Sequence, residues 1–406
     1  MSYKEESRVI NENIFDLVNQ LAKKERETQD KTYRNNFFNE NKDYFVLTED
    51  NSYSIKSKEI NNKIETLHTK TGAISESFEK FIKPLKLDYS NDIAILDICG
   101  GLGYNSSAAI ANFQENSNKN LKIDLIEISK STLACGLFTP SPIEAHNITK
   151  KTIENELINQ NYLTLNLEPT KIPENIDFNI FTDDARKTVQ NLKDTTYDAI
   201  FLDPFSQNMS PELFSTDFFK HLRRIIKDNG IVATYTSSAP VRNAFIEANF
   251  HIGQGPIFGR KQGGTIASPN PEMLNLSLPK NDEIRIALSD VSTTFKDPNL
   301  NFSSNEILIN RANEREKVRH NTKISSAVKS PIFLTKDLKE DEKLKRRVER
   351  NLIKMNIPST TSKEAFYILE PENTYQNTQN RTNNSRLRIL EMEKRLNKVK
   401  NKEIIL

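Results

Sequence analysis

The sequence predicts an α/β protein built on a doubly wound, mainly parallel sheet. Three observations favour this fold. Short apolar runs alternate with amphipathic segments between residues 93 and 248, and the runs are apolar on both faces, as strands are when helices cover each side of their sheet. A glycine-rich turn follows the first run directly. The 406 residues, of which 36% are hydrophobic, are enough to bury the core that such a sheet needs.

The individual elements follow from the spacing of apolar residues. Five apolar runs predict strands, at residues 93–99, 121–128, 178–182, 197–202 and 231–235. Apolar residues that recur every three or four positions predict helices between them, at residues 104–113, 185–192, 211–227 and 241–248. The same spacing predicts one earlier helix within residues 65–87, from Ile74, Phe78, Phe81 and Ile82.

Changes in composition divide the chain into four predicted segments. Residues 1–63 form a polar N-terminal extension with a helix near 10–21 and a strand at 44–48. Residues 64–268 form the α/β domain, and 269–335 form a mixed extension that packs on it, with one possible strand at 284–288. Residues 336–406 are a charged tail, partly helical at 336–355 and 384–400 or disordered.

Charge and cysteine content exclude several classes of protein. The net charge is only +2, although residues 336–406 hold 17 basic and 11 acidic side chains, against 40 and 44 in the rest. Two cysteines, Cys99 and Cys135, are too few for a disulfide framework or a zinc site, so no metal is expected. The first residues contain no signal-peptide segment, and no run of about 18 apolar residues occurs. We therefore expect a cytoplasmic protein without a membrane partner.

A nucleoside cofactor is expected at the turn after the first strand. Asp97 ends that strand, and Gly100, Gly101 and Gly103 follow, where glycine permits a tight turn and a close approach of the backbone to a ligand. Glu127 ends the next strand, 24 residues beyond Gly103, where a carboxylate can accept the two hydroxyls of a ribose. The alternative for Glu127 is a surface acid with no ligand.

The same turn distinguishes two classes of cofactor. The dinucleotide fingerprint has a third glycine three residues later, where this chain has Ser106. An acid before the glycines, Asp97, would repel a phosphate but suits the positively charged amino-acid end of S-adenosylmethionine. The turn therefore predicts S-adenosylmethionine.

Acids also end the third and fourth predicted strands. At the third, we assign the adenine contact to Asp184 with Ala185, although Asp183 is equally eligible and one of the two acids should cap the following helix. At the fourth, Asp203 would lie next to the transferred methyl group, where it can orient an amine or accept its proton. The alternative for Asp203 is a strand-end acid that caps a turn with Pro204.

Four motifs occur in an order that resembles the MnmC-type methyltransferases. They are residues 65–68 with 72–73, 201–206 with 211–214, 234–239 with 241–242, and 258–261. The resemblance covers about residues 64–268 and implies a Rossmann-like class I methyltransferase that uses S-adenosylmethionine. It further implies methylation of the aminomethyl group of the wobble uridine in tRNA, giving 5-methylaminomethyl-(2-thio)uridine.

The resemblance also assigns roles to individual residues. Asp203 matches the acid beside the transferred methyl, Glu127 the ribose acid, and Glu65 the acid near the cofactor mouth. Substrate contacts are implied for His68, Phe205, Arg242, Arg260 and Lys261. The chain departs from the family at Pro204, at Met209-Ser210 and at Phe214, so its substrate pocket could differ.

The chain resembles stand-alone archaeal forms that lack the FAD-dependent oxidoreductase domain of some bacterial relatives. A separate upstream enzyme would then supply the aminomethyl group. Contacts to RNA phosphates could come from a basic cluster at residues 343–347, for which the alternative is a solvated helix face.

Two other functions compete with this one. A polyamine aminopropyltransferase would share the strand-end acids, but its loop carries an acid where this chain has Leu102. A scaffold that binds RNA or protein without catalysis would not need the intact glycines and three acids.

Overall fold

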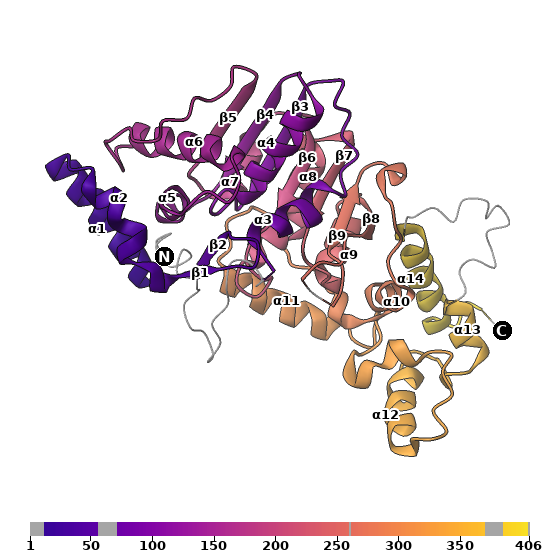
Figure 1. The fold of residues 1–406 in the computed structure, drawn as a ribbon. Coiled ribbons are helices and arrows are strands. Elements are labelled where there is room, and N and C mark those ends of the chain that lie inside the picture. Colours follow the sequence, from indigo (N-terminus) through magenta and orange to yellow (C-terminus); the bar gives the residue numbers. More distant parts are fainter. Residues whose placement is uncertain (1–11, 56–70, 260, 370–384, 405–406) are drawn as a thin grey trace. The chain divides into compact units, whose positions relative to one another are not determined.

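The computed structural model describes residues 12–55, 71–259, 261–369 and 385–404 (Figure 1). They form two compact units, each assembled from several stretches of the chain. Unit 1 comprises the described residues up to 205 together with 225–235 and 255–264. Unit 2 comprises 206–224, 236–254 and the described residues from 265 onward.

Unit 1 is built on five parallel strands in the order β5-β4-β3-β6-β7, which lie side by side in Figure 1. They are β3 (Ile93–Ile98), β4 (Leu121–Ile126), β5 (Ile176–Phe181), β6 (Tyr197–Leu202) and β7 (Ile226–Thr234). The chain adds β4 and β5 on one side of β3 and then β6 and β7 on the other. Ligands of such sheets bind outside the carboxyl ends of the strands where this direction reverses, which here is between β3 and β6. The prediction of a doubly wound, mainly parallel sheet is confirmed.

The burial of each strand agrees with its place in the sheet. Strands β3, β4 and β6 are buried at five of six positions, because helices cover both faces of a central strand. Strand β5 alternates between buried and accessible side chains, as expected where one strand is less covered. The apolar runs that predicted the sheet are therefore the ones at its centre.

Three helical segments of unit 1 contact strands of the sheet, and the first of them packs against the other two. They are α4 (Tyr104–Asn116), α6 (Ala145–Asn159) and η2 (Ser77–Ile82). Segment η2 continues the short helix α3 (Ala73–Glu76) as a π-helix, in which the Lys83 amide donates to the carbonyl of Phe78 at 2.9 Å. Unit 1 also contains α5 (Lys130–Phe138) and α7 (Ala185–Asn191).

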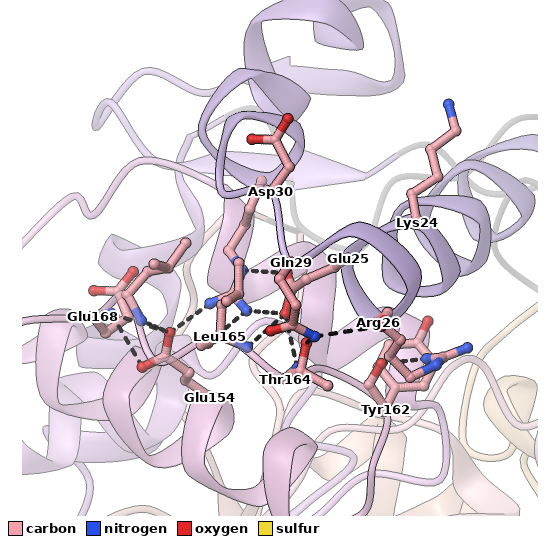
Figure 2. Close-up of polar contacts among 12 residues, drawn as sticks. Lys24, Glu25, Arg26, Gln29, Asp30, Glu154, Tyr162, Thr164, Leu165 and Glu168 are labelled. Atoms are coloured by element: carbon pink, nitrogen blue, oxygen red, sulfur yellow. Dashed lines mark hydrogen bonds and ion pairs between the residues drawn. The ribbon is translucent and has the colours of Figure 1, made fainter.

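The N-terminal part of unit 1 consists of two helices and a short hairpin: α1 (Glu12–Thr28), α2 (Thr32–Glu40), η1 (Lys42–Tyr44), β1 (Phe45–Leu47) and β2 (Tyr53–Ile55). A buried ion-pair cluster joins these helices to the rest of the unit. Arg34 donates to Glu25 of α1 and to Glu154 of α6. Figure 2 shows both carboxylates beside the loop after α6, where Glu25 accepts the amides of Thr164 and Leu165 at 2.8 and 2.9 Å. We call Arg34, Glu25 and Glu154 the Arg34 clamp.

Unit 2 is mainly helical and contains one antiparallel strand pair, β8 (His251–Gln254) with β9 (Thr265–Ser268). Its other elements are η3 (Pro211–Phe214), α8 (Thr216–Ile225), α9 (Ala239–Glu247), η4 (Pro271–Met273), α10 (Lys280–Leu288), η5 (Asp290–Ser292), α11 (Ser304–Val318), η6 (Ala327–Phe333), α12 (Glu342–Ile353), α13 (Lys363–Leu369) and α14 (Arg386–Lys400). Helix α14 packs against α10, and α12 packs against η6. The described parts of the charged segment after residue 336 therefore carry buried side chains, among them Val348, Ile368 and Leu396.

Two sequence predictions about elements are wrong. The strand expected at 284–288 is the end of helix α10, where Asp282 and Glu283 favour the first turn and Ile284, Ala287 and Leu288 are buried at helical spacing. The helix expected at 211–227 ends at Ile225, and β7 begins immediately with an irregular register opposite β6. The sequence did not predict α2, α5, α6, α11, α13 or the β8 and β9 pair.

No helix among the described residues is long and apolar enough to cross a membrane.

Candidate functional site

Three acids stand at the carboxyl ends of adjacent strands in unit 1. Asp97 is in β3, Glu127 follows β4 and Asp203 follows β6. Their strands are neighbours in register, because Ile98 pairs with both Ile126 and Leu202. The sequence predicted each acid at the end of a strand, and the structure brings the three strand ends together at the switch point of the sheet.

The turn after β3 combines tight packing with one open position. A Cβ on Gly100 would lie 2.5 Å from the Leu125 side chain, and one on Gly103 would lie 2.4 Å from Thr149. A Cβ on Gly101 would meet only a backbone oxygen at 3.8 Å. Gly100 and Gly103 are therefore required by packing, while Gly101 leaves room for a ligand to approach the backbone.

Asp97 is fully buried and only half satisfied. Its Oδ2 accepts the hydroxyl of Ser106 at 2.7 Å, whereas no described residue donates to its buried Oδ1. Burial raises the pKa of Asp97 to about 6, although the hydrogen bond from Ser106 favours the ionised form. A buried carboxylate oxygen without a donor is costly, so this position suits a ligand that brings a cation or a donor.

Glu127 is tied to the glycine turn. Its Oε2 accepts the Gly101 amide at 3.2 Å and its Oε1 accepts the Ser129 amide at 3.0 Å. Burial raises the pKa of Glu127 to about 7, and the charge of Asp97 adds to the rise. The next residue, Ile128, leaves 40% of its surface exposed, which places an apolar side chain beside this acid. The sequence analysis did not single out Ile128, although its position after Glu127 was a usable signal.

The two acids after β5 have different roles. Asp184 is the N-cap of α7, where it accepts the Arg186 amide at 2.8 Å and pairs with the Arg186 guanidinium at 2.8 Å. Asp183 keeps 62% of its side chain exposed, and its Oδ1 accepts the Asp184 amide. Asp184 is therefore the capping member of the pair, and Asp183 carries the more accessible carboxylate next to Ala185. An adenine contact by any of these residues stays a prediction.

Asp203 lies partly accessible at the end of β6, and Asn105 donates to its Oδ2 at 3.1 Å. Burial raises the pKa of Asp203 to about 7. The charges of Glu76 and Asp97 act in the same direction, while the Asn105 hydrogen bond and the charge of Lys80 oppose the rise. The residues Asn105, Glu76 and Lys80 were missed by the sequence analysis, because nothing in their local pattern links them to Asp203.

The remaining predicted residues are spread over the chain. Glu65, His68 and Arg260 lie outside the described residues. Phe205 and Lys261 both belong to unit 1, where Phe205 is part-buried and Lys261 is exposed. Arg242 belongs to unit 2, where it is 1% exposed, pairs with Asp282 at 2.8 Å and donates to Thr265. Its guanidinium stabilises the packing of that unit.

The electrostatics of the edge fit a positively charged nucleoside cofactor. The three acids have raised pKa values because burial withdraws them from water, and no cation among the described residues compensates the charge of Asp97 and Glu127. A sulfonium and an ammonium group would supply the missing charge, and the ribose hydroxyls can donate to Glu127. Within the described part of the chain, no group of three or more His, Cys, Asp or Glu residues could hold a metal ion.

Comparisons with known proteins agree with this site. Residues 146–270 match a family of S-adenosyl-L-methionine-dependent methyltransferases. The chain is 31% identical over 311 residues, 76% of its own length and 83% of the relative's, to an uncharacterized protein of Methanocaldococcus jannaschii. It is 41% identical over 71 residues to the tRNA 5-methylaminomethyl-2-thiouridine biosynthesis bifunctional protein MnmC of Ralstonia nicotianae, which is 18% of this chain and 11% of that protein.

A solved structure is also similar. The crystal structure of MnmC2 from Aquifex aeolicus superposes with a TM-score of 0.55 and 26% sequence identity, covering 67% of this chain and 85% of that one. The cofactor of the protein is S-adenosylmethionine, as the glycine turn and its acids indicated. The chain belongs to the MnmC-type S-adenosylmethionine-dependent methyltransferases.

Proposed function

We propose that the protein N-methylates the aminomethyl group on C5 of the wobble uridine in tRNA, converting 5-aminomethyl-(2-thio)uridine to 5-methylaminomethyl-(2-thio)uridine. The observation that carries this proposal is Asp203, a partly accessible carboxylate at the switch point of the sheet, next to the strand that ends in Asp97. The name of the Ralstonia relative supports the choice of nucleoside.

The chemistry requires an amine nucleophile and an acceptor for its proton. Bound S-adenosylmethionine supplies an electrophilic methyl group. Asp203 accepts a hydrogen bond from the neutral amine through Oδ1, which holds the nitrogen lone pair in line with that methyl. As the new C–N bond formed, the bond between the methyl and the sulfonium sulfur would break and leave the neutral thioether S-adenosylhomocysteine. The nitrogen would gain positive charge, and the Asp203 carboxylate would take its surplus proton.

The cofactor contacts are proposed from the geometry of the same edge. Asp97 would face the amino-acid end through its unsatisfied Oδ1, and Glu127 would accept the ribose hydroxyls. Ile128 would pack on the adenine ring, with Asp183 and Ala185 at its edge. These roles use every acid at the carboxyl ends of β3 to β6 except Asp184, which caps α7.

The tRNA side of the site is proposed from the resemblance. The resemblance implies substrate contacts by the exposed Lys261, by Arg260 and by His68, and it implies a cofactor contact by Glu65. Phe205 would line the pocket. Because an extruded base is commonly held on an aromatic ring, Phe205 is the residue in this set that suits stacking.

The test is methyl transfer to tRNA followed by nucleoside mass spectrometry. Purified protein, S-adenosylmethionine and tRNA bearing the aminomethyl group should give a wobble uridine heavier by one methyl. Asp203→Asn should lower the turnover number roughly 10²- to 10⁴-fold while cofactor affinity stays within a few-fold of the unsubstituted protein.

Two results would reject the proposal. A wobble uridine unchanged in mass excludes the substrate, and full turnover by Asp203→Asn excludes the role of the acid. A parallel assay with decarboxylated cofactor and putrescine detects aminopropyl transfer.

A further inference from the structure

We propose that Asn105 is the positioning residue for Asp203, and that the hydroxyl of Ser77 on the π-helical segment η2 fixes its amide. This inference rests on the proposed function, because it explains how the acid of that reaction is held. It adds two residues, neither of which contacts the reacting atoms.

The three side chains form a continuous chain of hydrogen bonds within unit 1. Ser77 Oγ lies 2.7 Å from Asn105 Oδ1, and Asn105 Nδ2 donates to Asp203 Oδ2 at 3.1 Å. Ser77 is 1% exposed and Asn105 is 6% exposed, so water competes little for either group.

The partners determine which way the Asn105 amide points. A carboxylate accepts hydrogen bonds only, so the NH₂ group must face Asp203 and the carbonyl oxygen must face Ser77. The Ser77 hydroxyl then donates to Asn105, and it can also turn its proton toward the Ala73 carbonyl at 3.0 Å. With Asn105 on Oδ2, no described residue donates to Oδ1 of Asp203, and this is the oxygen that the reaction uses.

The wide turn of η2 places Ser77 against α4. Segments η2 and α4 pack on each other, and the i to i+5 hydrogen bond of Lys83 marks the local π geometry. Such turns cost stability relative to a regular helix and are common at functional sites. Here the turn brings a donor to Asn105 in the first turn of α4.

Several charged groups face Asp203 from the elements packed around it. Glu76 and Lys80 pair with each other at 2.9 Å on α3 and η2, and both are buried. Asp97 lies at the end of β3. Glu76 and Asp97 disfavour the ionised form of Asp203, and Lys80 favours it. The hydrogen bond from Asn105 also favours the ionised form and so lowers the pKa of Asp203. Losing it raises the pKa of Asp203.

The experiment follows the titration of Asp203 directly. Protein labelled with ¹³C at aspartate side chains gives carboxyl resonances, and the one lost in Asp203→Asn identifies Asp203. Asn105→Ala should move its midpoint upward by about one pH unit, since a hydrogen bond to the charged form is removed. Ser77→Ala should move it in the same direction by less.

A matched control lies two residues before Ser77. Ser75 is in α3, and its backbone amide, which donates to Asp50, is kept by Ser75→Ala. This variant should leave the Asp203 midpoint unchanged. Circular dichroism and thermal melting identify the variants that fold. If Asn105→Ala does not fold, the Asp203 midpoint in Ser77→Ala decides the test.

Turnover gives a second readout. In Asn105→Ala, the rising limb of kcat against pH should shift upward with the midpoint, so that kcat falls about fivefold at the wild-type midpoint and largely recovers two pH units higher. Merely structural damage would lower kcat equally at every pH.

The two proposals fail in different ways. An unchanged Asp203 midpoint in folded Asn105→Ala and Ser77→Ala overturns the positioning role. Absence of tRNA methylation by the unsubstituted protein overturns the proposed substrate, while the titration still decides the role of Asn105.

Discussion

Asp97, Glu127 and Asp203 illustrate how one residue type acquires different tasks from its surroundings. Asp97 is enclosed and one of its oxygens receives no donor from the described residues, Glu127 is fixed by two backbone amides, and Asp203 is oriented by one side-chain amide. All three share a raised pKa caused mainly by burial. A carboxyl group with a raised pKa is partly protonated in the free protein. A cationic ligand must displace that proton when it binds.

Cofactor binding should therefore strengthen as pH rises. The folded pKa values of Asp97 and Glu127 are about 6 and about 7, so both are largely protonated at pH 5.5 and largely ionised at pH 7.5. A cation prefers the ionised form, and each displaced proton gives about a tenfold change in affinity per pH unit below the pKa. Calorimetry with S-adenosylmethionine from pH 5.5 to 7.5 measures this dependence.

A substitution provides the control for that measurement. Glu127→Gln removes one titrating group and should flatten the pH dependence as well as weaken binding. An affinity that stays constant over the range in the unsubstituted protein would contradict the assignment of these acids to the cofactor.

At the scale of residues, the sequence predicted those site residues that are recognisable from their immediate neighbours in the chain. The strand-end acids and the glycines follow from their position after apolar runs. The partners of Asp203 were not predictable, because Asn105 is 98 positions away and Ser77 is a further 28 from Asn105. The choice between Asp183 and Asp184 also required coordinates, since either could cap α7.

At the scale of elements, the Arg34 clamp holds α1 and α2 on unit 1. One guanidinium serves two carboxylates, and backbone amides of the loop after α6 complete the hydrogen bonding of these acceptors (Figure 2). Hydrogen bonds and the charge of Arg34 hold the pKa of Glu25 below its usual range, despite the opposing effect of burial. A group with a lowered pKa contributes stability above its unfolded pKa, and this stability is lost as pH falls through the folded value.

Removing the guanidinium should be strongly destabilising. Arg34→Met leaves two buried carboxylates without their shared cation, which we expect to lower the free energy of unfolding by about 3–5 kcal/mol. Urea denaturation at pH 7 measures the difference, and the gap should narrow below pH 4.5 as Glu25 becomes protonated.

Helix α1 supplies a comparison. Lys23 and Glu27 form an exposed pair at 3.8 Å, so Lys23→Met should change stability by no more than about 0.5 kcal/mol. If Arg34→Met and Lys23→Met lower the free energy of unfolding equally, the buried cluster stabilises the protein no more than an exposed ion pair does.

Element prediction from the sequence succeeded for the central strands and failed at transitions. Strands β3, β4 and β6 are buried on both faces, so their composition alone reveals them. Residues 226 and 227 were assigned to the helix predicted at 211–227, whereas pairing with β6 makes Ile226 a strand residue. Tertiary pairing outweighed the local preference there.

At the scale of the whole molecule, α12 of unit 2 carries five basic and two acidic side chains. Val348 and Leu352 are buried on one side of this helix, while Lys343 and the arginines at 346, 347 and 350 are exposed. The helix is therefore fixed by its apolar side and presents cations to solvent. That arrangement suits contacts to RNA phosphates if the substrate is tRNA.

Neutralising this face should weaken tRNA binding. The triple variant Arg346→Gln, Arg347→Gln, Arg350→Gln should reduce the slope of log affinity against log salt by about 0.9 for each phosphate that these arginines no longer neutralise. Fluorescence anisotropy with labelled tRNA at several salt concentrations measures it.

An exposed lysine on another helix of unit 2 serves as the reference. Lys317 of α11 keeps 74% of its side chain exposed, and Lys317→Gln should leave the slope unchanged. If the triple variant retains both affinity and slope, α12 is a solvated face and tRNA binds elsewhere.

The division into two units determines which truncations of the chain could leave a unit intact. The chain passes from one unit to the other five times, after residues 205, 224, 235, 254 and 264. Neither unit is a continuous stretch, so no single cut releases one of them intact. A chain ending near residue 268 would keep Phe218, Phe219 and Phe245, all fully buried, but lose most of the helices of their unit. Truncation at any single point should therefore disrupt at least one of the two units.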